Sequence, residues 1–199
     1  MDITARNSAM IVAGAIIVSV VTQIAYLTIK GPVVTAPMIW GTEAVVFLAI
    51  GLVALVPALR GGPHAPGWAA LALFGVFNLV QAGIGLTMFG PLGEAGDALA
   101  PAMEAILAGA FFFFFTGKAA MGIAGLVFGL ALLGKPGAVL KTFGALTALA
   151  GLAALLTNLA AMMLGRDLAM LAGGAGTAAA AFVAAALLIL PQTGTAAHR

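Results

Sequence analysis

The stretch DALAPAMEAILAGAFFFFFTGKAAMGIAGLVFGLALLGK, residues 97–135, decides the fold, because its path sets the topology of everything that follows it. The stretch is apolar enough to enter a lipid bilayer, yet it contains Glu104 and Lys118. A charged side chain at the centre of a bilayer costs roughly 2.5–3.5 kcal/mol on insertion scales. We therefore expect these two residues to lie near an interface, to be paired with another group, or to serve a function.

The composition of the chain indicates a polytopic helical membrane protein. Of its 199 residues, 63% are hydrophobic and only 7% are charged, whereas a soluble domain carries about 25% charged residues. Inside a bilayer the backbone must satisfy its own hydrogen bonds, so spans are helices or a closed barrel. The apolar runs here are continuous rather than alternating, which favours helices. We predict an all-α bundle that forms a single transmembrane domain over residues 1–199.

Glycine, proline and charged residues separate the apolar runs into spans. The first run lacks a small-residue cleavage site, so we expect a retained span rather than a signal peptide. We expect Trp40 to lie at a membrane interface and the phenylalanines 111–115 to contact lipid near an interface rather than to form an aromatic ligand site. Residues 97–107 show an amphipathic pattern that suits a helix lying on the membrane surface. The six predicted spans cover residues 10–29, 38–59, 68–88, 111–134, 142–164 and 168–190.

The alternative is a bundle of seven transmembrane helices, in which residues 99–116 and 119–134 are separate spans joined by a turn at Gly117 and Lys118. Charge bias favours six, since positively charged loops stay cytoplasmic. Seven spans divide the basic residues four against four. Six spans place both termini in the cytoplasm of a cell whose inner (plasma) membrane holds the chain. They collect Arg6, Arg60, Lys135, Lys141 and Arg199 on that side, against Lys30 and Arg166 outside.

The sequence offers no constellation for a cofactor or for catalysis. The chain has no cysteine, which excludes thiolate metal sites and iron–sulfur clusters. The two histidines, His64 and His198, lie outside the predicted spans, which excludes intramembrane haem ligation by paired histidines. The motif GLALLGK at residues 129–135 is followed by Pro136, where a P-loop needs serine or threonine. We expect no cofactor, no metal and, because basic residues are scattered singly, no nucleic-acid partner.

Polar residues within the predicted spans carry the functional signal. In the six-span topology most of them, Gln23 included, fall in the outer half of the membrane, which a cavity open to the outer side explains. The candidate ligand-binding residues are Asn78, Gln81, Glu43, Lys118 and Asn158. Asn78 and Gln81 lie on one helix face, and Glu43 would set a charge preference. In the alternative explanation the amides only bridge helices, and the two charged residues snorkel to an interface or neutralise one another.

Small residues form a stripe on each of two predicted spans, and such stripes let helices approach closely in lipid. The stripes consist of Gly122, Gly125 and Gly129 on one span and Gly144, Ala148 and Gly151 on the next. Either they pack against one another within the chain, or they form an interface with a second copy or another membrane-complex subunit. The lipid bilayer is the remaining expected partner.

Three phrases resemble a known family. They are FNLVQA beginning at Phe77, LVFGLALLGK ending at Lys135, and FGALTALAGLAALL beginning at Phe143. They are similar to a family of small bacterial inner-membrane proteins that is known only as a domain of unknown function. The resemblance implies a similar length and about six spans, and it brings no activity. Where the family has an arginine and a glutamate, this chain has the amides Asn78 and Gln81.

These observations predict a small-molecule or ion transporter, or a binding protein, with a polar cavity open to the outer side. The alternative is a non-catalytic accessory or scaffold subunit of a larger membrane complex, which the small-residue helices and the scarcity of charge would suit. An intramembrane enzyme ranks third, because no nucleophile–base pair or metal constellation can be assembled.

Overall fold

Residues 4–28 and 35–190 are described by a computed structural model, and within these two ranges the chain is helical and contains no strand. Six helices are long and apolar enough to cross a membrane, which supports a multi-pass membrane protein. Two short 3-10 helices, η1 (Gly96–Leu99) and η2 (Arg166–Leu168), precede the fourth and the sixth of them. The six are α1 (Ala5–Thr28), α2 (Ala36–Arg60), α3 (Ala65–Glu94), α4 (Ala100–Leu133), α5 (Ala138–Leu164) and α6 (Ala169–Ile189).

The deciding stretch forms one uninterrupted helix, so the seven-span alternative is wrong. α4 runs for 34 residues straight through Gly117 and Lys118, where that alternative required a turn. Residues 97–107 do not form a separate surface helix either. They comprise most of η1 and the first two turns of α4, because nothing between Ala100 and Leu107 interrupts the helical hydrogen bonds.

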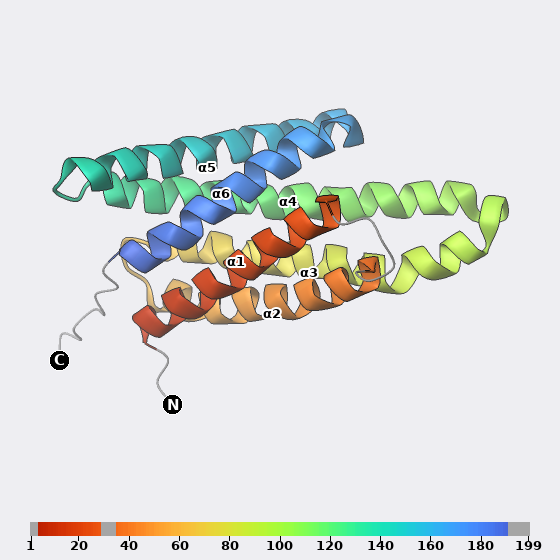
Figure 1. The fold of residues 1–199 in the computed structure, drawn as a ribbon, viewed down its shortest axis with the longest axis horizontal. Coiled ribbons are helices and arrows are strands. Elements are labelled where there is room, and N and C mark those ends of the chain that lie inside the picture. The colour runs from red at the N-terminus through yellow and green to blue at the C-terminus, as the bar shows by residue number, and fades with distance from the viewer. Residues whose placement is uncertain (1–3, 29–34, 191–199) are drawn as a thin grey trace.

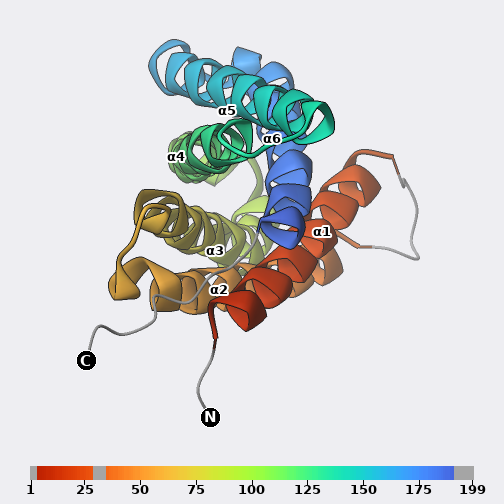
Figure 2. The ribbon, with the colours of Figure 1, turned by 90° about the vertical axis from the view of Figure 1, so that its left-hand side faces the viewer.

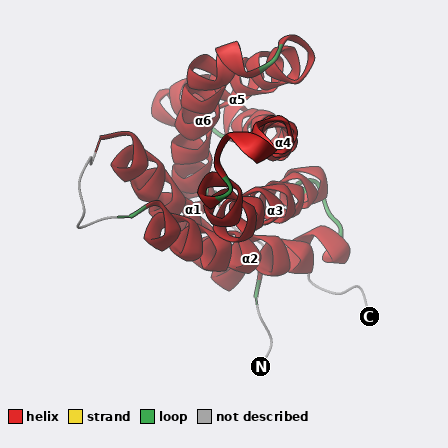
Figure 3. Cartoon of the chain, turned by 90° about the vertical axis from the view of Figure 1, so that its right-hand side faces the viewer, coloured by secondary structure: helices red, strands yellow, loops and turns green. Residues whose placement is uncertain are grey.

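Five of the helices form a ring. Consecutive helices pack side by side from α1 to α4, and α6 completes the ring by contacting both α4 and α1. Figure 2 shows this ring along the length of the bundle, with α5 outside it, against α4 and α6. α6 crosses the bundle obliquely and lies beside α1 (Figures 1 and 3). The ring has two ends: α1 and α3 begin where α2, α4 and α6 end.

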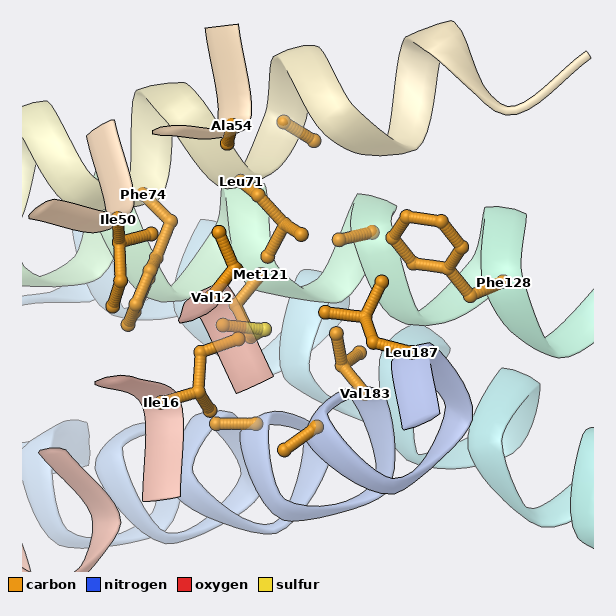
Figure 4. Packing of buried hydrophobic residues seen from close by; sticks show 14 of the residues in the cluster. Val12, Ile16, Ile50, Ala54, Leu71, Phe74, Met121, Phe128, Val183 and Leu187 are labelled. Carbon is orange, nitrogen blue, oxygen red and sulfur yellow. The ribbon is translucent and has the colours of Figure 1, made fainter. Parts of the chain in front are cut away.

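Apolar side chains fill one half of the ring. They come from the first halves of α1 and α3 and from the second halves of α2, α4 and α6, and they converge on the centre (Figure 4). Among them Val12, Phe74, Met121 and Val183 are fully buried. Close packing of these side chains therefore closes this half of the bundle. Protein interiors are packed about as densely as organic crystals.

The glycine stripes of α4 and α5 pack against each other within the chain. A Cβ atom built on Gly122 would lie 2.6 Å from the carbonyl oxygen of Gly151, and one built on Gly144 would lie 2.8 Å from the oxygen of Gly129. These distances are shorter than real Cβ contacts, so only glycine allows the two backbones to come this close. The close approach explains how helices without polar contacts can hold together in lipid.

Opposite charges mark the two ends of the bundle. Among the described residues, the end where α1 begins carries Arg6, Arg60, Lys135 and Lys141, and we name it the basic end. The end where α1 finishes carries Glu94, Asp97, Glu104 and Asp167 with Arg166, and we name it the acidic end. Arg166 donates a hydrogen bond of 2.7 Å to Glu104. Lys30 and Arg199, which the charge bias also counted, lie outside the described residues.

Candidate functional site

A cavity of about 500 Å³ lies in the half of the ring that faces the acidic end. Its walls come from the last turns of α1, the first turns of α2, the second half of α3 and the first halves of α4 and α6. Ile24, Leu27 and Met170 stand at its rim, and all three are exposed. Small-molecule sites typically enclose 300–1,000 Å³ and are mostly apolar with a few polar groups. The cavity has this size and character.

Polar side chains line this cavity. Glu43 is one of them, and it is only 8% exposed. The hydroxyl of Thr22 on α1 donates a hydrogen bond of 2.9 Å to its Oε1 atom. Gln23, Gln81 and Thr177 also reach the wall of the cavity. A buried carboxylate needs such partners, because an unpaired charge away from water is strongly disfavoured.

Lys118 lies directly behind the wall. It is 5% exposed, and its Nζ atom donates a hydrogen bond of 3.2 Å to the hydroxyl of Thr177, which does face the cavity. The ammonium also lies 5.4 Å from the centre of the Phe114 ring and 6.0 Å from that of Phe74. These distances suit cation–π attraction. Gly176 leaves room for the lysine stem, since a Cβ atom there would lie 2.5 Å from Lys118 Cδ.

The two buried charges attract each other across this site. Glu43 and Lys118 are close enough for their charges to interact, although the ion pair found within 4.0 Å among the described residues joins Arg166 to Glu104. The carboxylate of Glu104, which lies on the same helix as Lys118, is thus paired at the acidic end. Lys118 and Glu43 therefore each rely on a threonine hydroxyl for direct contact and on each other for charge balance.

Two of the candidate residues lie away from the cavity. Asn78 is buried, donates a hydrogen bond of 2.8 Å to the carbonyl oxygen of Phe74 in its own helix, and packs against Gly117. Asn158 is fully buried on α5 and donates to the carbonyl oxygens of Ala154 at 2.8 Å and Ala172 at 3.0 Å. Asn158 therefore bridges α5 to α6. The cavity brings together Glu43 and Gln81 at its wall and Lys118 behind it.

Aromatic rings line the cavity, and two of them, Phe111 and Phe114, were expected to contact lipid. Trp40 lies against Gly85 of α3 and makes an edge contact with Phe89 at 5.5 Å between ring centres. Across the cavity, Phe111 and Phe114 of α4 form a second edge contact at 6.3 Å. Of the five phenylalanines at 111–115, Phe112 is more than half exposed. An α-helix completes one turn every 3.6 residues, so five consecutive rings point in different directions and cannot share one environment.

No group of three or more histidine, aspartate or glutamate residues is arranged to hold a metal ion within residues 4–28 and 35–190. Comparison of the chain with protein-family models, with curated proteins and with solved structures gives no match. The resemblance to a family of inner-membrane proteins therefore stays a prediction.

Proposed function

We propose that this chain is a multi-pass membrane protein that binds a small molecule or ion in the cavity and transports it. The observation that carries the proposal is the difference between the two halves of the ring of helices. A cavity with a buried carboxylate at its wall faces one end, and packed apolar side chains close the other. Transporters commonly bind their substrates near the middle of the bilayer and expose the site to one side at a time.

The charges at the two ends support an orientation for this proposal. Basic residues concentrate on the cytoplasmic side of membrane proteins, and the closed half faces the end that carries Arg6, Arg60, Lys135 and Lys141. We propose that this end is cytoplasmic, that both termini lie there, and that the membrane is the inner (plasma) membrane. The cavity then opens to the outer side, and transport requires the apolar core to part.

The proposal is tested by solute-dependent stabilisation of the purified protein. A ligand that binds only the folded state raises the melting temperature, and the rise grows with the logarithm of the ligand concentration relative to its dissociation constant. We expect at least one solute in a panel of organic cations, anions, zwitterions and neutral molecules to stabilise the protein. Gln81→Leu should weaken that stabilisation, since it removes an amide from the cavity wall without introducing a charge.

Thr87→Val provides a matched control on the same helix. Thr87 is exposed, and its hydroxyl bonds to the carbonyl oxygen of Gly83 within its own helix. This variant should respond to solute like the parent. A panel without any stabilising solute, or a Gln81→Leu variant that responds like the parent, would count against binding in this cavity.

The alternative is a non-catalytic accessory or scaffold subunit, which the scarcity of charge and the small-residue helices would suit. The small-residue stripes of α4 and α5 contact each other within the chain, so these two stripes do not support it. A partner that survives mild detergent purification would favour this alternative.

A further inference from the structure

One charged side chain gives the cavity its electrostatic preference. Among the described residues that line the wall, the charged one is Glu43. Lys118 is not among the lining residues, because its ammonium lies against Thr177 and two aromatic rings behind the wall. A ligand in the cavity therefore contacts the carboxylate of Glu43 directly, whereas the ammonium of Lys118 lies behind Thr177. A positively charged ligand group is favoured at this wall.

The rest of the wall suits the apolar body of such a ligand. Trp40 and Phe89 cover one side and Phe111 and Phe114 the other, and aromatic faces attract cations as well as apolar groups. The exposed rim residues, among them Ile24 and Met170, are aliphatic or thioether side chains. A ligand that is small and fully hydrated would lose its hydration shell here without replacement, since few polar groups are present. An amphiphilic ligand loses much less.

The surroundings of the cavity carry the same sign of charge as its wall. The acidic end, which bounds the half of the ring that holds the cavity, carries Glu94, Asp97, Glu104 and Asp167 among the described residues. Arg166 neutralises Glu104 there. Four acidic residues and one basic residue, Arg166, therefore lie at the described part of this end. A negative field of this kind concentrates cations and repels anions near the opening.

We propose that the ligand is an amphiphilic organic cation, with an ammonium or phosphonium centre carried on an aromatic or aliphatic body. This inference rests on the proposed function and names its substrate class. The positive centre binds at Glu43, and the body lies between the Trp40 and Phe111 sides of the cavity. Lys118 then acts as an internal competitor, because it is the other positive charge that attracts the Glu43 carboxylate.

The test uses two ions of nearly the same shape and opposite charge, tetraphenylphosphonium and tetraphenylborate, with neutral triphenylphosphine oxide as the third probe. Binding to the full chain in detergent is followed by the melting temperature and by the fluorescence of the tryptophans, of which Trp40 lines the cavity. We expect saturable binding of the phosphonium and much weaker binding of the other two probes. This comparison needs no substitution and is independent of how any variant folds.

Two substitutions give opposite expectations for the phosphonium. Glu43→Gln keeps the shape of the side chain but removes its charge, and we expect affinity to fall at least about tenfold, as for the loss of a charge-assisted contact. Lys118→Met removes the competing ammonium and keeps an apolar stem, and we expect affinity to rise. A merely structural role for both residues would weaken binding in both variants.

Each other outcome overturns the inference in a recognisable way. Preference for tetraphenylborate or for the neutral probe refutes the cation and leaves a binding cavity in place. Equal phosphonium affinity in the parent and in a folded Glu43→Gln variant places the cation elsewhere, in the detergent micelle for instance. Failure of all three probes also refutes the inference. The proposed function itself fails if the wider solute panel stabilises nothing as well.

Discussion

The amide of Asn158 joins two helices, and we predict that it stabilises the protein without affecting its ligands. Its Nδ2 atom donates across the α5–α6 interface to Ala172 at 3.0 Å, and the side chain is fully buried. Asn158→Leu should lower the melting temperature, since interhelical hydrogen bonds in membrane proteins contribute about 0.6 kcal/mol on average and up to about 1.7. The rise in melting temperature that a bound solute produces should be the same as in the parent.

Thr157→Val is the control for this prediction. The neighbouring threonine is half-buried, and its hydroxyl donates to carbonyl oxygens of its own helix, those of Ala153 and Ala154. It should melt like the parent. An Asn158→Leu variant that melts normally but no longer responds to solute would show that the amide serves the ligand and that its bridge is secondary.

At this scale the sequence predicted which residues are unusual but not what each of them touches. Asn78 and Gln81 are three positions apart and share a broad helix face, yet three positions still turn a helix by about 300°. That difference of about 60° from a full turn is enough to direct Asn78 toward Gly117 and Gln81 toward the cavity. The hydroxyls of Thr22 and Thr177 were missed because threonine is ordinary in a membrane helix and only its contacts distinguish it.

The interface between α4 and α5 depends on glycine, and one added methyl group should disturb it. A Cβ atom at Gly122 would lie 2.6 Å from the carbonyl oxygen of Gly151, and the backbone there cannot move without separating the helices. We expect Gly122→Ala to destabilise the protein by about 1–3 kcal/mol, the usual range for overpacking. Thermal unfolding in detergent measures the difference.

Gly83→Ala is the matched control, because a Cβ atom on this glycine of α3 would meet nothing within 4 Å. Alanine favours a helix interior over glycine by about 0.8–1.0 kcal/mol. This variant should melt at the same temperature as the parent or above it. If both alanines had the same effect, the close approach of α4 and α5 would not be the reason for the glycine at 122.

Glycine also explains why the deciding stretch was difficult to interpret. The pair Gly117 and Lys118 looked like a turn, since glycine and a charge often end a span. In the structure Gly117 is helical and leaves space for the side chain of Asn78, and Lys118 is buried beside Thr177. Both residues meet the needs of packing between helices that are distant in sequence. The local sequence pattern contains no information about such neighbours. The apolar character of the spans is local, and six apolar helices were predicted correctly, although α3 and α4 are longer than the predicted spans 68–88 and 111–134.

Two helices, α3 and α4, are longer than a bilayer requires. At 1.5 Å per residue, the 30 residues of α3 and the 34 of α4 make helices of about 45 and 51 Å, whereas the hydrocarbon core is about 30 Å thick. Their hairpin extends past the ends of α2, α5 and α6 (Figure 1). The acidic residues Glu94, Asp97 and Glu104 lie on this extension, so it can hold charge in water while the spans remain apolar.

This asymmetry yields a prediction about orientation. The native chain has no cysteine, so single cysteines can be placed on a silent background at Ala95, on the acidic end, and at Ala138, on the basic end. Both positions are exposed. Basic residues are retained in the cytoplasm, so an impermeant thiol reagent added to intact cells should label Ala95→Cys and should label Ala138→Cys only after permeabilisation. The reverse labelling pattern would mean that the cavity faces the cytoplasm. An organic cation would then bind from inside the cell.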